Sequence, residues 1–308
     1  MLLSASRRTD IPCHFADWFM QRIREGFVLT RNPMNHAQLS RIPLSPDIVD
    51  CIIFWTKDPA GILPHLDELD ERGYRYYFQF TLTPYDSDIE ANLRPKDKIE
   101  QSFIALSKRI GSESIVWRYD PILVNDSIDL AYHAYHFNRL CELLSPYCRS
   151  VTISFLDFYA KLHSSLLRPI TEDEIVNLAS MIADTARTYR LPVHACCEKL
   201  DLTPYGIAPA ACIDKAMIEQ ICESPLKLSP DKNQRPGCGC CESVDIGAYN
   251  TCINGCIYCY ANNSPSAAVR RYTAHDPNSP ILFGRVAEGE CITEKKPQST
   301  LIRQQMLF

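Results

Sequence analysis

The stretch IEQSFIALSKRIGSESIVWRY, residues 99–119, places a helix pattern directly before a strand pattern. Ile99, Phe103, Leu106 and Ile110 recur at the spacing of one helix face, and Gly111 follows where a helix commonly ends. The β-rich run Ser114–Tyr119 comes next. A helix that leads straight into a strand is the repeating unit of α/β proteins with a parallel sheet, so this stretch predicts that class.

The same alternation continues on both sides of this unit. A capping box of Thr171 and Glu174 predicts the start of another helix. The other β-rich runs are Leu2–Ser6, Cys51–Thr56, Tyr76–Thr83, Ser150–Leu156 and Leu191–Cys196. Six such units predict an α/β fold with a partial (β/α)6-type parallel barrel rather than a small doubly wound sheet. No Gly-rich phosphate-binding fingerprint follows any of these strands, so the sequence lacks the motif that usually indicates a nicotinamide cofactor or a nucleoside triphosphate.

Polar or ionisable residues follow every predicted strand. The sets are Arg7–Asp10, Thr56–Asp58, Thr81 with Thr83, Arg118 with Asp120, Ser154 with Asp157, and His194 with Glu198. Parallel strands present their carboxyl ends at one edge, so this recurrence predicts a site on the C-terminal face of the sheet. The alternative is that each residue is a strand-end cap or part of a surface ion pair.

Composition and charge narrow the function classes. The 308 residues hold 32 Lys and Arg against 37 Asp and Glu, and the net charge of −5 offers no broad surface for nucleic acid. No run of eighteen uninterrupted apolar residues and no export signal occur, so we expect a cytoplasmic protein with no membrane partner.

Cysteine is the unusual residue. Four of the fifteen cysteines lie in residues 1–195 and the other eleven in residues 196–308. An odd count without an export signal does not suit a disulfide framework. Dense thiols in a reducing compartment indicate metal ligands or catalytic groups instead.

The motif Cys252-Ile-Asn-Gly-Cys256-Ile-Tyr-Cys259 carries the strongest chemical signal. Three thiolates on a tight loop with Gly255 can converge on one inorganic cluster, and thiolates are the usual ligands of iron–sulfur clusters. Three ligands leave one iron of a cubane open to a substrate or cosubstrate. Two alternatives stay open: a structural zinc-binding protein, and an iron–sulfur electron-transfer or redox protein.

This motif resembles the C-x3-C-x-aromatic-C signature of the radical S-adenosylmethionine (SAM) superfamily. The flanking residues Tyr249–Cys252 and Cys259–Asn262 extend the resemblance towards members similar to spore photoproduct lyase. The whole chain also resembles an uncharacterised bacterial family of unknown function that carries this motif late. That resemblance includes Ser6–Pro12, Phe54–Lys57 and Trp117–Pro121 and covers most of residues 1–262.

The resemblance implies a set of cofactors and roles. Cys252, Cys256 and Cys259 would bind a [4Fe–4S] cluster with an open iron site, and Tyr258 would lie beside the adenine of SAM. Reductive cleavage of SAM would then lead to abstraction of a hydrogen atom from a small-molecule or nucleic-acid-derived substrate. An electron donor such as flavodoxin or ferredoxin would be the redox partner. The remaining candidates for binding the cosubstrate are Lys57 and Arg118, as cations for the methionine carboxylate, with Ser154 and Glu198.

The late position of the motif departs from the superfamily, whose members carry it after the first strand. A circular permutation accounts for this if Ser243–Asn250 forms a strand beside Leu2–Ser6, since chain ends close in space tolerate permutation. We therefore expect a permuted barrel over residues 1–262, with the cluster segment at 236–262. Residues 263–308 are expected to form a surface loop and a C-terminal tail.

Other cysteines predict a second metal site, formed by Cys196, Cys212, Cys238 and Cys240. Gly237 and Gly239 allow the backbone to bend the thiols of Cys238 and Cys240 towards one centre. The site would take a second iron–sulfur cluster or zinc, with Cys241 as an alternate ligand. The alternative is that these thiols are small buried hydrophobic groups.

Overall fold

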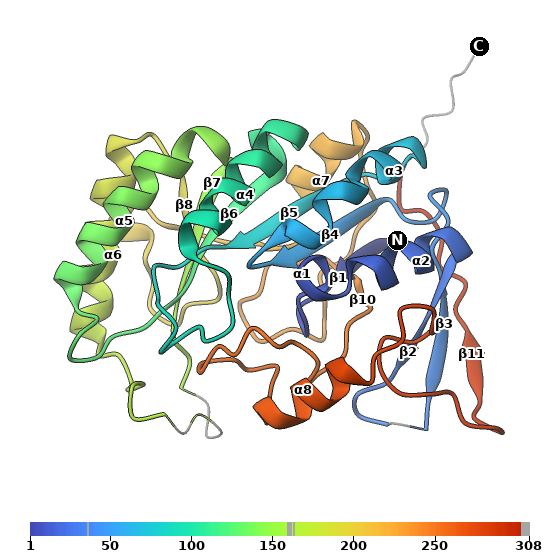
Figure 1. Ribbon diagram of the computed structural model, residues 1–308. Helices are drawn as coiled ribbons and strands as arrows, with labels where there is room; N and C mark the ends of the chain where they lie inside the picture. Colours follow the sequence, from blue (N-terminus) through green and yellow to red (C-terminus); the bar gives the residue numbers. More distant parts are fainter. Residues whose placement is uncertain (36, 159–161, 163, 303–308) are drawn as a thin grey trace, which may run out of the picture.

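One large parallel sheet organises the chain, of which the computed structural model describes residues 1–35, 37–158, 162 and 164–302 (Figure 1). Within these residues, eight strands form the sheet in the order β10-β1-β4-β5-β6-β7-β8-β9, and all neighbours are parallel. The predicted α/β class is confirmed. The bounds are β1 Leu2–Ala5, β4 Cys51–Thr56, β5 Tyr76–Thr81, β6 Ile115–Ile122, β7 Ser150–Phe155, β8 Val193–Ala195, β9 Ala208–Pro209 and β10 Val244–Asp245.

Helices connect these strands and cover both faces of the sheet. The bounds are α1 Ile11–His14, α2 Ala16–Glu25, α3 Leu66–Glu71, α4 Lys96–Ile110, α5 Leu130–Leu144, α6 Glu172–Thr188, α7 Lys215–Cys222 and α8 Pro265–Thr273. The predicted capping box is present at the start of α6, and α4 ends at Gly111, whose φ of 87° suits glycine.

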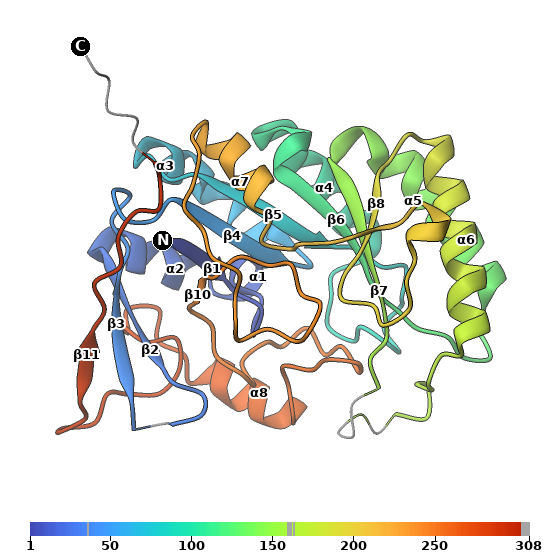
Figure 2. The same ribbon diagram turned by 180° about the vertical axis from the view of Figure 1, so that it is seen from behind.

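Alternate residues of each strand face two different apolar layers. On one face, Phe54 stacks on Phe78, and Trp117 stacks on Phe137 of α5 with ring centroids 5.4 Å apart. On the other face, which we call the α7 face, Ile53 and Tyr77 pack in the cluster of buried residues that contains Met217 and Ile218 of α7. Figure 2 shows α7 from this side.

The observed strands differ from the predicted runs mainly at their ends. Cys51–Thr56 matches β4, whereas β8 is shorter than the run Leu191–Cys196. β6 continues to Ile122, although Pro121 carries no amide hydrogen for the ladder. A register shift against β7 between Tyr119 and Ile122 accommodates that proline.

The late strand predicted within Ser243–Asn250 is present as β10. It pairs in parallel with β1, with Leu3 opposite Val244 and Ser4 opposite Asp245, which confirms the predicted neighbour. The carboxylate of Asp245 accepts hydrogen bonds from Ser4 Oγ at 3.0 Å and from the Arg7 amide at 2.8 Å. This carboxylate adds to the backbone bonds that hold the two-residue strand to β1, among them the bond from the Ile246 amide to the Ser4 carbonyl at 3.1 Å.

The segment after residue 262 contains more structure than the predicted loop. Ser264 caps α8, since its side chain accepts the amide of Ala267, and Pro265 occupies the first turn. Strand β11, Ile292–Glu294, joins β2, Phe27–Arg31, and β3, Leu39–Pro43, in a small second sheet. Helix α8 and strand β11 thus lie within the residues 263–308 that the sequence predicts as a loop and tail, and the Ser264 cap with Pro265 explains where the helix begins.

Candidate functional site

The motif loop is anchored at the carboxyl ends of β1 and β4 by its own Asn254. This side chain is buried, with His14 Nε2 at 2.6 Å from its oxygen, and its amide nitrogen donates to Asp10 Oδ2 at 3.1 Å. Asp10 also accepts from Thr56 Oγ1 at 2.7 Å and from the Lys57 amide at 2.8 Å. Burial raises the pKa of Asp10, an effect that His14 and these hydrogen bonds only partly offset. One carboxyl group thus joins β1, β4 and the loop.

The other side of the loop runs against residues 89–92. The Ile257 amide donates to the Ile89 carbonyl at 3.0 Å, and the Asn92 amide donates to the Asn254 carbonyl at 3.0 Å. Gly255 has a φ of 72°, and a Cβ there would lie 2.8 Å from Asn92 Nδ2. Glycine is therefore required both by the backbone conformation and by the approach of Asn92.

Glu90 lies beside the motif with two lysines and Tyr258. Its carboxylate accepts from Lys57 Nζ at 2.7 Å and Thr83 Oγ1 at 2.9 Å, and it also contacts Lys96 Nζ and the Tyr258 hydroxyl. Burial alone would raise the pKa of Glu90, but the two ammonium groups lower it to about 2. The Lys57 ammonium lies 5.5 Å from the centroid of the Tyr258 ring. The buried carboxylate thereby fixes both a cation and an aromatic ring at the loop.

The three motif thiols are partly buried and affect one another. Burial raises the pKa of Cys252, and the charges of Asp10, Cys256 and Cys259 act in the same direction. Burial also raises the pKa of Cys256 to about 12, although Lys57 opposes the effect. Three thiols that repel one another as thiolates are suited to hold a cationic centre between them.

Within the described residues, no group of three or more His, Cys, Asp or Glu side chains converges as a single metal ion requires. Each cysteine of a cubane binds a different iron, so its ligands spread more widely than those of one ion. The donor set of three thiols on a glycine-containing loop fits a cubane with one iron not bound by cysteine.

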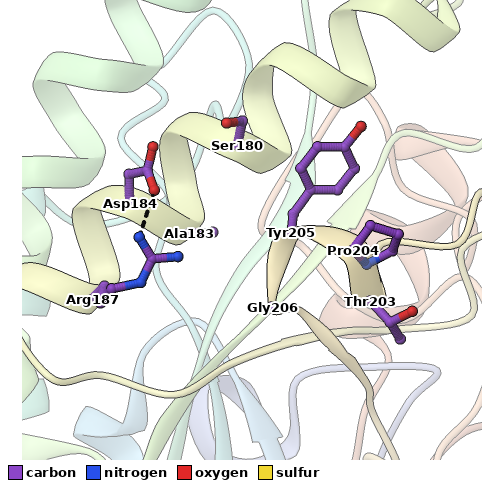
Figure 3. A pocket seen from close by; sticks show the side chains of 8 residues that line it. All are labelled: Ser180, Ala183, Asp184, Arg187, Thr203, Pro204, Tyr205 and Gly206. Carbon is purple, nitrogen blue, oxygen red and sulfur yellow. Dashed lines mark hydrogen bonds and ion pairs between the residues drawn. The ribbon is translucent and has the colours of Figure 1, made fainter.

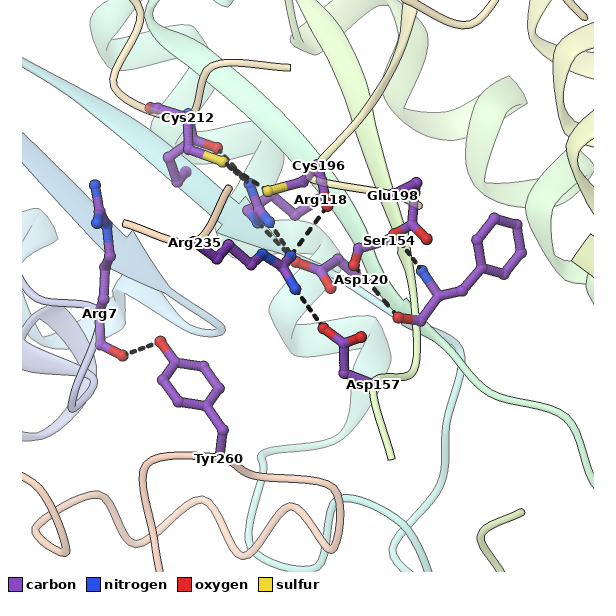
Figure 4. A network of polar contacts seen from close by, with 12 residues as sticks. Arg7, Arg118, Asp120, Ser154, Asp157, Cys196, Glu198, Cys212, Arg235 and Tyr260 are labelled. Atoms are coloured by element: carbon purple, nitrogen blue, oxygen red, sulfur yellow. Dashed lines mark hydrogen bonds and ion pairs between the residues drawn. The ribbon is translucent and has the colours of Figure 1, made fainter. Parts of the chain in front are cut away.

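A second set of thiols, Cys196, Cys212, Cys238 and Cys240, gathers on the α7 face. Figure 4 shows two of them, Cys196 and Cys212, beside Arg118. Cys196 Sγ lies 3.4 Å from Cys212 Sγ, and the Ile213 amide donates to Cys240 Sγ at 3.4 Å. The hydrogen bond with Cys212 lowers the pKa of Cys240, and the Ile213 amide and Arg7 add to that effect. The structure thus brings together thiols that lie up to 44 residues apart in the sequence.

The other predicted binding residues, Lys57, Arg118, Ser154 and Glu198, each have polar partners. Lys57 lies with the motif loop, whereas Arg118 Nη1 donates to Cys212 Sγ at 2.9 Å and also pairs with Asp120. Glu198 accepts the Phe155 amide at 3.0 Å, and burial raises its pKa to about 7. Ser154 Oγ donates to the Phe155 carbonyl at 3.4 Å. Arg118 is thus held by Cys212 and Asp120, whereas Lys57 pairs with Glu90 and also feels the charge of Asp120.

Several residues at the site escaped sequence reasoning. Glu90, His14, Asn254 and Asp245 were not singled out, although Asp10 belongs to a noted strand-end run. Asn254 lies inside the motif, so its polar side chain between two ligands was an available signal. Glu90 lies on an aperiodic loop 33 residues from Lys57 and carried no such signal.

A surface pocket, shown in Figure 3, has no cysteine in its lining. It is formed by α6 and the turn at 203–206, and it is lined by Ser180, Ala183, Asp184, Arg187, Thr203, Pro204, Tyr205 and Gly206. Its Asp184–Arg187 ion pair is exposed, and such pairs contribute little. The pocket offers no chemistry comparable to that of the cysteines.

Comparisons place the chain among known sequences. In the described part of the chain, no helix is long and apolar enough to cross a membrane. A search of curated proteins returned no match to the chain. A family model covers residues 2–261, which include both thiol sets. The chain belongs to the family described as Domain of unknown function (DUF1848).

Proposed function

We propose that the chain is a radical SAM enzyme whose [4Fe–4S] cluster is bound by Cys252, Cys256 and Cys259. One observation carries the proposal. The C-x3-C-x2-C loop follows β10 and is anchored through Asn254 to the carboxyl ends of β1 and β4. Ligand sites of parallel sheets lie at this edge.

The sheet is interpreted as a partial (β/α) barrel in permuted order. β10 takes the place of the first strand, with the cluster loop directly after it, and β1 becomes the next strand. The parallel pairing of β10 with β1 supports this interpretation, as does the contact of Asp245 with the backbone of Arg7. In this interpretation the motif comes late in the sequence, but its loop still follows the strand that takes the place of the first one.

Lys57 is the residue best placed to hold the methionine carboxylate of SAM. Its ammonium lies beside Cys256 and is paired with Glu90. Because Lys96 also contacts Glu90, Lys57 can turn to an incoming carboxylate without leaving Glu90 unpaired. Arg118, which is engaged with Cys212 and Asp120, is less available for this role.

Tyr258 is positioned to contact the adenine. Its hydroxyl is fixed by Glu90, and its ring lies edge-on to Tyr85 with centroids 6.3 Å apart. The apolar cluster around it, which includes Leu123, Leu156 and Leu167, excludes water from this side of the loop. A fixed ring in a dry environment favours stacking or edge contact with a base. When bound, the cluster supplies the electron for reductive cleavage of SAM, and in the cell flavodoxin or ferredoxin would supply that electron.

The test is anaerobic reconstitution with iron and sulfide, followed by dithionite and SAM and detection of 5′-deoxyadenosine by mass spectrometry. We expect a brown protein that forms 5′-deoxyadenosine, and we expect Cys252→Ala/Cys256→Ala/Cys259→Ala to form none. The control is Cys291→Ala, which changes an exposed thiol outside both sets and should retain activity. A colourless zinc-loaded protein, or a brown protein that leaves SAM intact, would overturn the proposal in favour of a zinc or electron-transfer protein.

A further inference from the structure

The second thiol set draws on three separate segments of the chain. Cys196 follows β8, Cys212 precedes α7, and Cys238 and Cys240 lie in the loop before β10. Hydrogen bonds to backbone carbonyls hold these segments: the Cys241 amide donates to the Ile213 carbonyl at 3.0 Å, and Arg235 Nη2 donates to the Cys196 carbonyl at 3.2 Å. The thiols therefore meet because three loops are fastened to one another.

Cations surround this thiol set. Arg118 donates directly to Cys212 Sγ, and its guanidinium carbon lies 5.5 Å from the centroid of the Trp55 ring. The Arg7 guanidinium lies 5.3 Å from the same ring. Thiolates bound to metal carry net negative charge, and two guanidinium groups beside them offset it. A set of neutral, merely space-filling thiols would not need these cations.

Two nearby hydrogen-bond donors have no acceptor. In the described part of the chain, Arg7 Nη2 and Trp55 Nε1 are among six buried side-chain atoms that lack a hydrogen-bond partner. A buried donor without an acceptor costs about 1–3 kcal/mol. Arg7 and Trp55 contact each other, so both donors would be satisfied by a hydrogen-bond acceptor bound beside that contact. Hydrogen bonds to cluster sulfur atoms are one of the ways in which proteins tune iron–sulfur clusters.

Three of the sulfur atoms lie close enough together to bind metal as a group. Cys212 lies between Cys196 and Cys240, since it contacts both. Two sulfur atoms 3.4 Å apart fit ligands of the same metal atom, which is either a zinc ion with Zn–S bonds of about 2.3 Å or one iron of a cluster. A cluster also contains sulfide, which can accept hydrogen bonds from Arg7 Nη2 and Trp55 Nε1, and this favours a cluster over zinc. We propose that Cys196, Cys212, Cys238 and Cys240 bind a second iron–sulfur cluster, with Arg7, Trp55 and Arg118 as the donors and cations around it.

The experiment measures iron and acid-labile sulfide in the full-length variant that lacks Cys252, Cys256 and Cys259, reconstituted anaerobically. We expect this variant to retain iron and sulfide in equal amounts, about two to four of each per chain, and to hold less iron than the unaltered protein. Adding Cys212→Ser should remove that iron. Adding Cys222→Ser instead is the matched control, because Cys222 is a buried thiol on the same α7 face outside the set.

Each outcome decides the proposal. Iron and sulfide that persist in the Cys222 control and disappear with Cys212→Ser support it. Zinc without sulfide, or no metal at all in the triple variant, overturns it. If Cys212→Ser lowers the circular dichroism signal, Cys238→Ser repeats the test in the loop without removing a buried thiol. The SAM-cleavage assay plays no part here, so failure of this proposal leaves the proposed function standing, and the reverse also holds.

Discussion

Replacing Gly247 by alanine should separate β10 from β1. An alanine Cβ would lie 2.1 Å from Ser6 Oγ and 2.6 Å from Ser6 Cβ, far inside normal contact. The φ of Gly247 lies outside the left-handed region, so the clash itself is the perturbation. Overpacking costs about 1–3 kcal/mol. Since the Asp245 hydrogen bonds to Ser6 and to the Arg7 amide would also be disturbed, we expect the upper end, about 3 kcal/mol.

Urea denaturation measures this change. With a slope of about 3 kcal/mol per molar urea, the midpoint should fall by about 1 M. Iron retained after reconstitution should fall as well, because Cys252 lies five residues beyond Gly247 on the same segment. For the urea midpoint alone, the control is Gly239→Ala, whose Cβ would meet Ala211 Cβ at an ordinary 3.4 Å and should cost less than about 1 kcal/mol.

A second substitution identifies the cause. Ser6→Gly removes both clashing atoms, so the double variant should recover about 1 kcal/mol of the loss; recovery stays incomplete because the hydrogen bond from Ser6 to Asp245 is gone. An unchanged midpoint in Gly247→Ala, or a double variant no more stable than the sum of the single effects, would refute the close packing of β10 on β1.

Three further predictions concern the interior. Glu90→Gln leaves Lys57 and Lys96 without their buried counter-charge, so the free energy of unfolding measured in urea should fall by about 3 kcal/mol. The control is Asp97→Asn, which removes an exposed ion pair with Lys98 and should change that free energy by less than about 0.5 kcal/mol. Burial lowers the pKa of His133 from 6.5 to about 4, so between these pH values the unfolded chain binds more protons than the folded chain. The free energy of unfolding should therefore decline by about 3 kcal/mol as the pH falls from 6.5 to 4, and His133→Gln should give a flatter pH profile. Asn254→Ala removes two anchors of the motif loop, so a chelator should strip iron several-fold faster than from the unaltered protein, and equal rates would contradict the anchoring role.

Local patterns determined much of the fold and the chemistry of the motif. The apolar spacing in α4, the stop at Gly111 and the capping box of α6 are encoded within a few turns of chain, so they could be predicted without neighbours. Parallel strands followed from their alternation with helices, and the expected neighbour of β1 followed from the motif placement. The spacing of Cys252, Cys256 and Cys259 is likewise local, because the whole motif that predicts a cluster lies within eight residues.

Only the tertiary structure decided which polar groups meet. Glu90 contacts Lys57 and Lys96, and Asp10 meets Asn254 across 244 residues, because loops without periodicity fold against the edge of the sheet. The four cysteines of the second set were named from the sequence, but the cations around them were not predicted as their neighbours. Sequence patterns report which face of an element is buried; they do not report which distant side chain fills the space opposite, since that depends on how the strands pair and the loops close.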